Sequence, residues 1–213
     1  MQTRIVNINK NSIQEAIEIL KNSGIVAFPT ETVYGLGCDF SDTTALKKIF
    51  EVKGRSFSKP LAAHISKLEE VEMLADDIPN IFFELAEKFL PGPLSIVLKK
   101  KEGVSEIMTA GMNTVAIRFP SDNTAHQLIS QYGKPLAATS ANVSGRKAPI
   151  SAKYVLAELN NKIPFIIDGG ETKFKIESTV ISLVDEPLLL REGAISVSKI
   201  EEVLKIKLEY KDK

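Results

Sequence analysis

A chain of 213 residues with 44% apolar and 25% charged residues can bury a sizeable core and has the composition of an ordinary globular protein. Its 27 Lys and Arg residues balance its 27 Asp and Glu residues, which argues against a general electrostatic attraction to nucleic acid but leaves room for a local basic cleft. The single cysteine, Cys38, excludes an intramolecular disulfide, and the lack of an apolar leader or of a stretch of about 18 apolar residues predicts a cytoplasmic protein without a membrane span.

The first half of the chain predicts strands and helices in alternation. Residues 4–8 alternate between apolar and polar side chains, as in a short strand. Apolar residues from Ile13 to Leu20 then recur at helical spacing, and Gly24 stands where a helix C-cap is expected. The further elements expected are a strand at 25–28, a helix at 42–51, a strand at 61–65 and helices at 67–75 and 79–90.

In the second half, some strands follow one another without an intervening helix. The expected elements are strands at 94–98 and 114–119, a helix at 122–132, a strand at 135–139, a helix at 151–160, strands at 165–168, 179–184 and 187–190, and a helix at 196–205. We therefore predict an α/β fold with a twisted open mixed sheet and flanking helices. It forms one domain over residues 1–205, followed by a charged tail at 206–213 that frays.

Polar clusters stand near the ends of several expected strands, where side chains of open α/β sheets face a crevice. The first is PTETVYGLG at residues 29–37, in which Gly35 and Gly37 predict a tight turn. The other clusters are Lys53-Gly54-Arg55, Ser58-Lys59-Pro60, Thr114 with Arg118, Thr139-Ser140-Ala141-Asn142, Glu177-Ser178-Thr179 and Arg191-Glu192-Gly193.

The clusters supply cations and neutral hydrogen-bonding groups but no matched acid and base. The cations are Lys53, Arg55, Lys59, Arg118 and Arg191. Such a set suits an anionic substrate whose reaction needs neutralisation of charge more than proton transfer, as in phosphoryl or nucleotidyl transfer. The sequence has no GxxxxGK[ST] or GxGxxG loop and no HExxH motif, and its two histidines are isolated, so we predict no metal ligands from the protein.

Each cluster also has a purely structural interpretation. Lys53 and Arg55 could form a solvated turn after a helix, where cations suit the helix dipole. Arg118 lies in an apolar strand and needs an anionic partner, which could be a ligand or an internal carboxylate. Turn, strand or core roles could likewise account for Thr139 to Asn142, Ser178 and His64.

Seven ordered stretches of the sequence resemble one known family. They are GIVAFPTETVYGLGCD, KGR followed by KPLAAHIS, GPLSIVLKK, TVAIRFPSD, PLAATSANVSG, ESTVISL and LLREGAIS. They run from about residue 24 to residue 196, and in this order they resemble the YrdC-like threonylcarbamoyl-AMP synthases. The resemblance implies a twisted open sheet with a large concave cationic cavity. Some members carry a further C-terminal domain that closes over the cavity. Because this sequence ends soon after residue 205, the resemblance is to the single-domain form.

The resemblance implies an enzyme that condenses L-threonine, bicarbonate and ATP to threonylcarbamoyl-AMP and pyrophosphate, for the threonylcarbamoyladenosine modification of tRNA. ATP would be a substrate, with magnesium carried on its phosphates. A separate threonylcarbamoyl transferase complex would use the product, and weak binding of tRNA or other RNA is a further expectation. In the single-domain form, either a local loop such as the basic stretch near residues 53–59 would close the cavity or no closure would occur.

The resemblance also implies roles for individual residues. The family's Lys-x-Arg and Ser-x-Asn signature falls on the expected catalytic set, Lys53, Arg55, Ser140 and Asn142. The expected ATP-binding residues are Arg55, Lys59, Thr114, Ser140 and Arg191. The expected threonine-binding residues are Thr32, His64, Arg118 and Ser178, with Arg118 holding the carboxylate.

A binding module of another class is the alternative. It would be a non-catalytic domain that holds double-stranded RNA or tRNA on its concave face. Zero net charge and an aromatic content of 7% count against it. A related domain also occurs in hydrogenase-maturation carbamoyltransferases, but the sequence has neither their acylphosphatase nor their zinc-finger segments.

Overall fold

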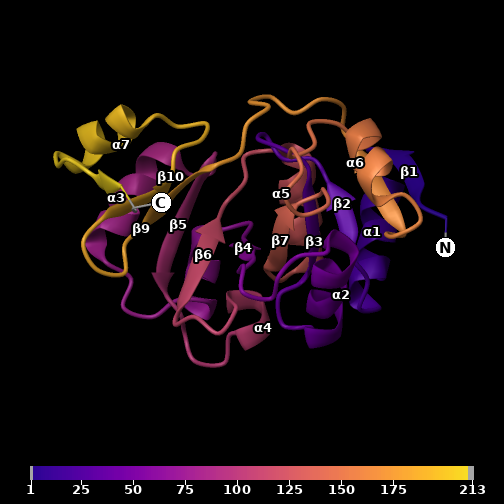
Figure 1. Ribbon diagram of the computed structural model, residues 1–213, viewed down its shortest axis with the longest axis horizontal. Coiled ribbons are helices and arrows are strands. Elements are labelled where there is room, and N and C mark those ends of the chain that lie inside the picture. The colour runs from indigo at the N-terminus through magenta and orange to yellow at the C-terminus, as the bar shows by residue number, and fades with distance from the viewer. Residues whose placement is uncertain (1, 211–213) are drawn as a thin grey trace.

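The computed structural model describes residues 2–210, whose strands form one open sheet with helices on both faces (Figure 1). Within this range eleven strands pair in the order β1-β8-β2-β3-β7-β4-β6-β5-β9-β10-β11. The strands are β1 Arg4–Asn7, β2 Val26–Phe28, β3 Gly35–Asp39, β4 Ala62–His64, β5 Leu94–Lys99, β6 Thr114–Arg118, β7 Leu136–Ser140, β8 Phe165–Asp168, β9 Thr179–Ser182, β10 Leu188–Arg191 and β11 Glu209–Tyr210. Because β4 and β6 are parallel whereas β5 and β6 are antiparallel, the predicted mixed sheet is confirmed.

Local signals in the sequence set the limits of several helices. The helices are α1 Lys10–Lys21, α2 Thr43–Lys53, α3 Asn80–Phe89, α4 Glu106–Thr109, α5 Asn123–Tyr132, α6 Ala152–Leu159 and α7 Val197–Leu204, with a 3-10 helix at Leu68–Met73. Asp42 and Asp122 accept hydrogen bonds from backbone N–H groups in the first turns of α2 and α5. Gly54 and Gly133 end the same two helices in the left-handed conformation. Every helix among residues 2–210 is too short or too polar to span a bilayer.

Helices cover the two faces of the sheet unequally. On one face, α1 and α5 pack against Phe28, Leu136 and Phe165 of strands β2, β7 and β8. Residues that alternate with these, such as Ala27 and Ile166, belong to the opposite core, which contains α2, α3, α4, α6 and α7. On the face of α1 and α5, helices therefore cover the part of the sheet near β8, β2 and β7. Side chains of strands β4, β6, β5 and β9 on that face line a hollow instead.

The segment at residues 29–37 differs from the expected tight turn, because Gly35 and Gly37 lie in β3 and neither has a positive φ. Their lack of a side chain serves packing instead. A Cβ on Gly37 would come within 2.9 Å of Cε1 of Phe28, and one on Gly35 within 3.3 Å of its Cζ. The glycines allow the Phe28 ring to lie across the β2–β3 pair.

Other differences from expectation lie at the ends of elements. The expected helix at 67–75 is a 3-10 helix, whose first turn is fastened by the Glu70 carboxylate accepting from the N–H of Ser66. The tail was expected to fray, but Leu208 is buried and β11 pairs with β10. That expectation is wrong for residues 208–210, and residues 211–213 lie outside the described range.

Candidate active site

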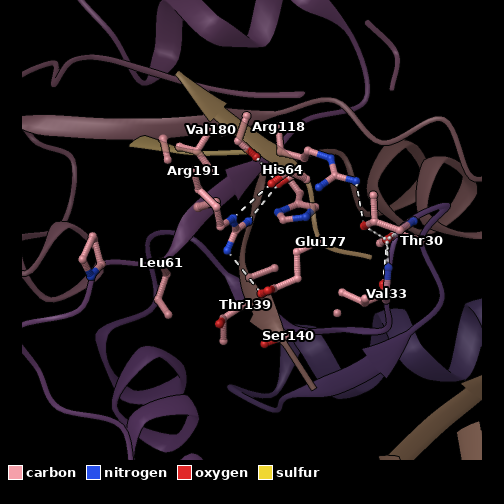
Figure 2. A pocket seen from close by; sticks show the side chains of 18 of the residues that line it. Thr30, Val33, Leu61, His64, Arg118, Thr139, Ser140, Glu177, Val180 and Arg191 are labelled. Atoms are coloured by element: carbon pink, nitrogen blue, oxygen red, sulfur yellow. Dashed lines mark hydrogen bonds and ion pairs between the residues drawn. The ribbon is translucent and has the colours of Figure 1, made fainter. Parts of the chain in front are cut away.

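A cavity of about 220 Å³ occupies the hollow over β4, β6, β5 and β9 (Figure 2). Several of the predicted site residues line it together. They are Thr32, Arg55, His64, Arg118, Ser140, Ser178 and Arg191. Arg55 follows α2, Arg118 ends β6 and Arg191 ends β10, so three separate segments of the chain bring their arginines to one place. The predicted Lys53, Lys59, Thr114 and Asn142 are not among the lining residues.

Lys53 is buried behind the cavity wall and holds the turn that follows β7. Its Nζ donates to the backbone oxygen of Asn142 at 2.6 Å and also to that of Ser140. A longer contact of 3.4 Å joins Nζ to Oδ1 of Asn142. Burial, together with the charge of Arg55, lowers the pKa of Lys53 to about 7. In this structure Lys53 and Asn142 therefore shape the wall that carries Ser140.

The loop between α2 and β4 is closed on itself by Arg55. The guanidinium donates from Nε to the backbone oxygen of Lys59 at 3.0 Å and from Nη2 to that of Pro60 at 2.9 Å. The Lys59 side chain is exposed at this loop. Thr114 lies at the opposite end of β6 from Arg118, paired with Lys99, and is half-buried.

Arg118 is held by two residues of the PTETVYGLG segment. Its Nη2 donates to Oε1 of Glu31 at 2.7 Å and to Oγ1 of Thr32 at 3.0 Å. The side chains of Arg118 and Glu31 are only 5% and 4% exposed. The sequence left open whether Arg118 pairs with a ligand or with an internal carboxylate, and the structure shows an internal carboxylate, that of Glu31. The Nε of Arg118 is also buried and has no hydrogen-bond partner among residues 2–210.

Glu31 is a residue that the sequence-based site omitted. It joins two parts of the site, since its Oε2 also accepts from the backbone N–H of Ser121 at 3.1 Å. The signal was present, because a glutamate between two threonines directly after a buried strand needs a partner when it is itself buried.

His64 is a buried neighbour of Arg118 across the β4–β6 pair. Burial and the Arg118 charge lower the pKa of His64 to about 3, so the imidazole is neutral at pH 7. Its Nδ1 is buried without a hydrogen-bond partner among the described residues. His64 therefore lines the cavity as a neutral imidazole and does not act there as a cation.

Arg191 organises the opposite wall of the cavity. Its Nε donates to the backbone oxygen of Ser178 at 3.1 Å, and its Nη2 donates to Oγ of Ser178 at 3.2 Å. Its Nη1 pairs with Oε1 of Glu177 at 3.2 Å, as the dashed lines in Figure 2 show. Ser178 also shares a hydrogen bond of 2.9 Å with Ser95. Glu177 lines the cavity and offsets part of the arginine charge.

Residues 18–193 match the model of the Sua5/YciO/YrdC family, described as telomere recombination. The threonylcarbamoyl-AMP synthase of Pyrococcus abyssi is 45% identical over 207 residues, which cover 95% of this chain and 61% of that protein. The protein of the same name from Bacillus subtilis is 43% identical over 201 residues, which cover 93% of this chain and 58% of that protein. The chain thus spans about three fifths of the length of these relatives.

A solved structure matches the fold closely. The crystal structure of P. abyssi Sua5 complexed with L-threonine superposes with a TM-score of 0.95 at 44% identity, over 98% of this chain and 63% of that one. The family model, the sequence identities and the fold agree over most of the chain. The chain therefore belongs to the Sua5/YciO/YrdC family, as the seven sequence stretches predicted.

Proposed function

We propose that the chain carries the catalytic cavity of a threonylcarbamoyl-AMP synthase, which joins L-threonine, bicarbonate and ATP into threonylcarbamoyl-AMP and pyrophosphate. The observation that carries the proposal is the convergence of Arg55, Arg118 and Arg191 on one cavity. It is supported by 45% identity to the P. abyssi threonylcarbamoyl-AMP synthase. The same identity favours the synthase over the RNA-binding alternative.

Threonine binds at the end of the cavity that contains Arg118. Arg118 has a buried Nε without a partner among residues 2–210, and His64 has a buried Nδ1 in the same condition. Both side chains line the cavity, and each has hydrogen-bonding capacity that the described residues do not use. The threonine carboxylate accepts from Arg118, while the hydroxyls of Thr32 and Ser178 bind its remaining polar groups.

ATP binds at the end that contains Arg55 and Ser140. Arg55 and Lys59 neutralise the phosphates from this end, and Arg191 does so from the wall that it forms with Ser178. Ser140 orients the nucleotide with help from Asn142 and Thr114. Lys53 acts through the turn that it holds, since its Nζ donates to the backbone oxygens of Ser140 and Asn142.

Magnesium accompanies the phosphates of ATP, because Mg²⁺ keeps most of its waters and binds substrate phosphates with few protein ligands. Among residues 2–210, no group of three or more His, Cys, Asp or Glu side chains is arranged to hold a metal ion. Glu177 supplies a carboxylate to the cavity lining, and it already pairs with Arg191. When bound, magnesium would neutralise phosphate charge.

The chemistry explains the need for cations. The threonine amine reacts with bicarbonate to give a carbamate and water. A carbamate oxygen then forms a bond to the α-phosphorus of ATP, and pyrophosphate leaves with the electrons of the broken phosphorus–oxygen bond. Both reactants are anions, so fixed arginines reduce their repulsion and stabilise the charge that develops at phosphorus. The carbamate decomposes in water, so a cavity that excludes water prolongs its life.

The product is consumed by a threonylcarbamoyl transferase that modifies tRNA, in the cytoplasm. The experiment supplies the protein with ATP, L-threonine and labelled bicarbonate, and follows threonylcarbamoyl-AMP by chromatography and mass spectrometry. We expect labelled product only when all three substrates are present. Pyrophosphate release that does not depend on threonine, or no release at all with all three substrates, would contradict the proposal.

A further inference from the structure

Three alanines stand side by side on the floor of the cavity. In the sheet, Ala62 of β4 is in register with Ala116 of β6 on one side and with Ala138 of β7 on the other. All three line the cavity, whereas the next residues, Ala63 and Ile117, belong to the core behind the sheet. The floor is therefore a row of methyl groups, spaced by about 4.8 Å from strand to strand. We call these three residues the alanine row.

The alanine row separates the two ends of the cavity. His64 and Arg118 stand two residues beyond Ala62 and Ala116 along the parallel strands β4 and β6. Because β7 is antiparallel to β4, Ser140 lies two residues from Ala138 in the opposite direction. Two residues of a strand span about 6.6 Å. Figure 2 shows the same arrangement, with His64 and Arg118 at one end of the cavity and Ser140 at the other.

We propose that the alanine row is the surface over which the two reactants meet, and that its small side chains are required for the reaction. This inference rests on the proposed function. The carbamate of threonine, held from the Arg118 end, and the α-phosphorus of ATP, held from the Ser140 end, must approach to about 3–3.5 Å. A side chain larger than alanine in the row would enter the space where the carbamate oxygen approaches the phosphorus.

The fold itself does not require alanine at these positions. Alanine is a poor strand former, whereas β-branched residues are favoured in sheets. Ala62 and Ala116 are half-buried, and the open side of each faces the cavity. The residues on either side of Ala116, Val115 and Ile117, are both β-branched. Ala116→Val should therefore fold with an unchanged or higher melting temperature.

The test compares Ala116→Val with wild-type protein in binding and in turnover. Titration calorimetry measures L-threonine and a non-hydrolysable ATP analogue, each alone and then one in the presence of the other. We expect each ligand alone to bind within about threefold of wild type. We expect the analogue to bind at least tenfold more weakly to the variant once threonine is saturating, and condensation to fall at least 100-fold.

Two controls separate side-chain size from other effects. Ala116→Ser keeps the room above the row and should retain turnover within tenfold. Val97→Ile enlarges the neighbour of Ala116 on β5, which does not line the cavity, and should behave as wild type. Should Ala116→Val fail to fold, Ala62→Val replaces it in the same measurements.

The outcomes are distinguishable from those for the proposed function. If the wild-type protein binds threonine and the analogue together but forms no product, the proposed function fails. In that case, weaker binding of the analogue to threonine-saturated Ala116→Val still supports the alanine row as the surface where the two ligands meet. The inference is overturned if the variant binds both ligands together as wild type does, if it turns over normally, or if it loses either ligand alone by more than tenfold. Wild-type protein that binds neither ligand overturns both proposals.

Discussion

At the residue scale, Arg118 and Glu31 form a buried ion pair, in which each charge needs the other because both are shielded from water. Burial lowers the pKa of the Arg118 guanidinium, and the Glu31 carboxylate opposes that shift. The pair fixes the Nη2 end of the guanidinium, whereas its Nε is buried without a hydrogen-bond partner among the described residues. Glu31 thus stabilises the charged arginine before any ligand arrives, which reduces the reorganisation needed on binding.

Replacing Glu31 by glutamine should destabilise the protein strongly. Glu31→Gln keeps the shape but leaves Arg118 as a buried charge without its partner, a change that typically costs about 3–5 kcal/mol. Urea unfolding measures the loss. The matched control is Glu171→Gln, which removes an exposed ion pair with Lys175 and should change stability by less than about 0.5 kcal/mol. Equal small effects of the two variants would contradict the importance assigned to Glu31.

His64 makes a testable contribution to the pH dependence of stability. Burial and Arg118 lower its pKa in the folded protein from the ordinary 6.5 to about 3. Between these values the unfolded chain binds a proton that the folded chain does not, so the contribution of His64 is complete above pH 6.5 and is lost as the pH falls toward 3. The slope from one such group is at most about 1.4 kcal/mol per pH unit.

The variant His64→Gln should therefore lose stability less steeply than wild type between pH 6 and pH 4. Chemical denaturation at several pH values measures the slope. A slope in His64→Gln as steep as that of wild type would show that another group controls the acid limb.

The sequence indicated which residues require an ionic or hydrogen-bonding partner, but it did not identify the partner. An arginine in an apolar strand had to meet an anion, but Glu31 lies 87 residues away along the chain, and only the folded structure joins the two. The cation set was similarly visible in the sequence. That Lys53 would point into a wall, and not into the cavity, depends on the turn after β7, which no local pattern describes.

At the scale of elements, the segment at residues 169–178 connects two distant parts of the sheet. It leaves β8 near one edge and enters β9 on the other side of the cavity, so it crosses the sheet as a strap (Figure 1). Tyr34 fastens its start, since its hydroxyl donates to the backbone oxygen of Gly170 at 2.8 Å and accepts from the N–H of Gly169 at 3.1 Å. The backbone N–H of Phe174 donates to the backbone oxygen of Glu31 at 2.8 Å.

Removing the Tyr34 hydroxyl should loosen this strap. Tyr34→Phe loses two hydrogen bonds, each contributing about 1 kcal/mol, so amide exchange in residues 169–178 should quicken about tenfold or more. Hydrogen–deuterium exchange with mass spectrometry measures it. Tyr132→Phe, which loses a hydrogen bond to Asp39 at 2.6 Å, is the matched control and should leave the strap unchanged. Equal exchange in the two variants would contradict the fastening role of Tyr34.

Elements with strong local signals were predictable, and those that depend on contacts between strands were not. The helix expected at 42–51 is α2, which Asp42 caps at its start and which runs two residues further, to the left-handed Gly54. The strand β3 was missed because glycines are poor strand formers, and their use becomes clear only when the Phe28 ring is seen against them. The strand β11 was also missed, because it is defined by its pairing with β10 and not by a local pattern.

At the scale of the whole molecule, the strand order creates the site. The mixed α/β class follows from the alternation of apolar segments, and the family resemblance added a concave cavity. Neither specified that β4 lies between β7 and β6, although this order brings His64 beside Arg118 and aligns the alanine row. Such pairings join residues far apart in sequence, so local patterns do not encode them.

In the proposed function, separate arginines of one cavity bind two different anions. The most direct measurement is the KM for L-threonine and for ATP in pyrophosphate release by wild type, Arg118→Ala and Arg55→Ala. We expect Arg118→Ala to raise the KM for threonine at least tenfold more than that for ATP, and Arg55→Ala to do the reverse. Equal changes of both constants in both variants, or pyrophosphate release that neither substitution affects, would contradict it.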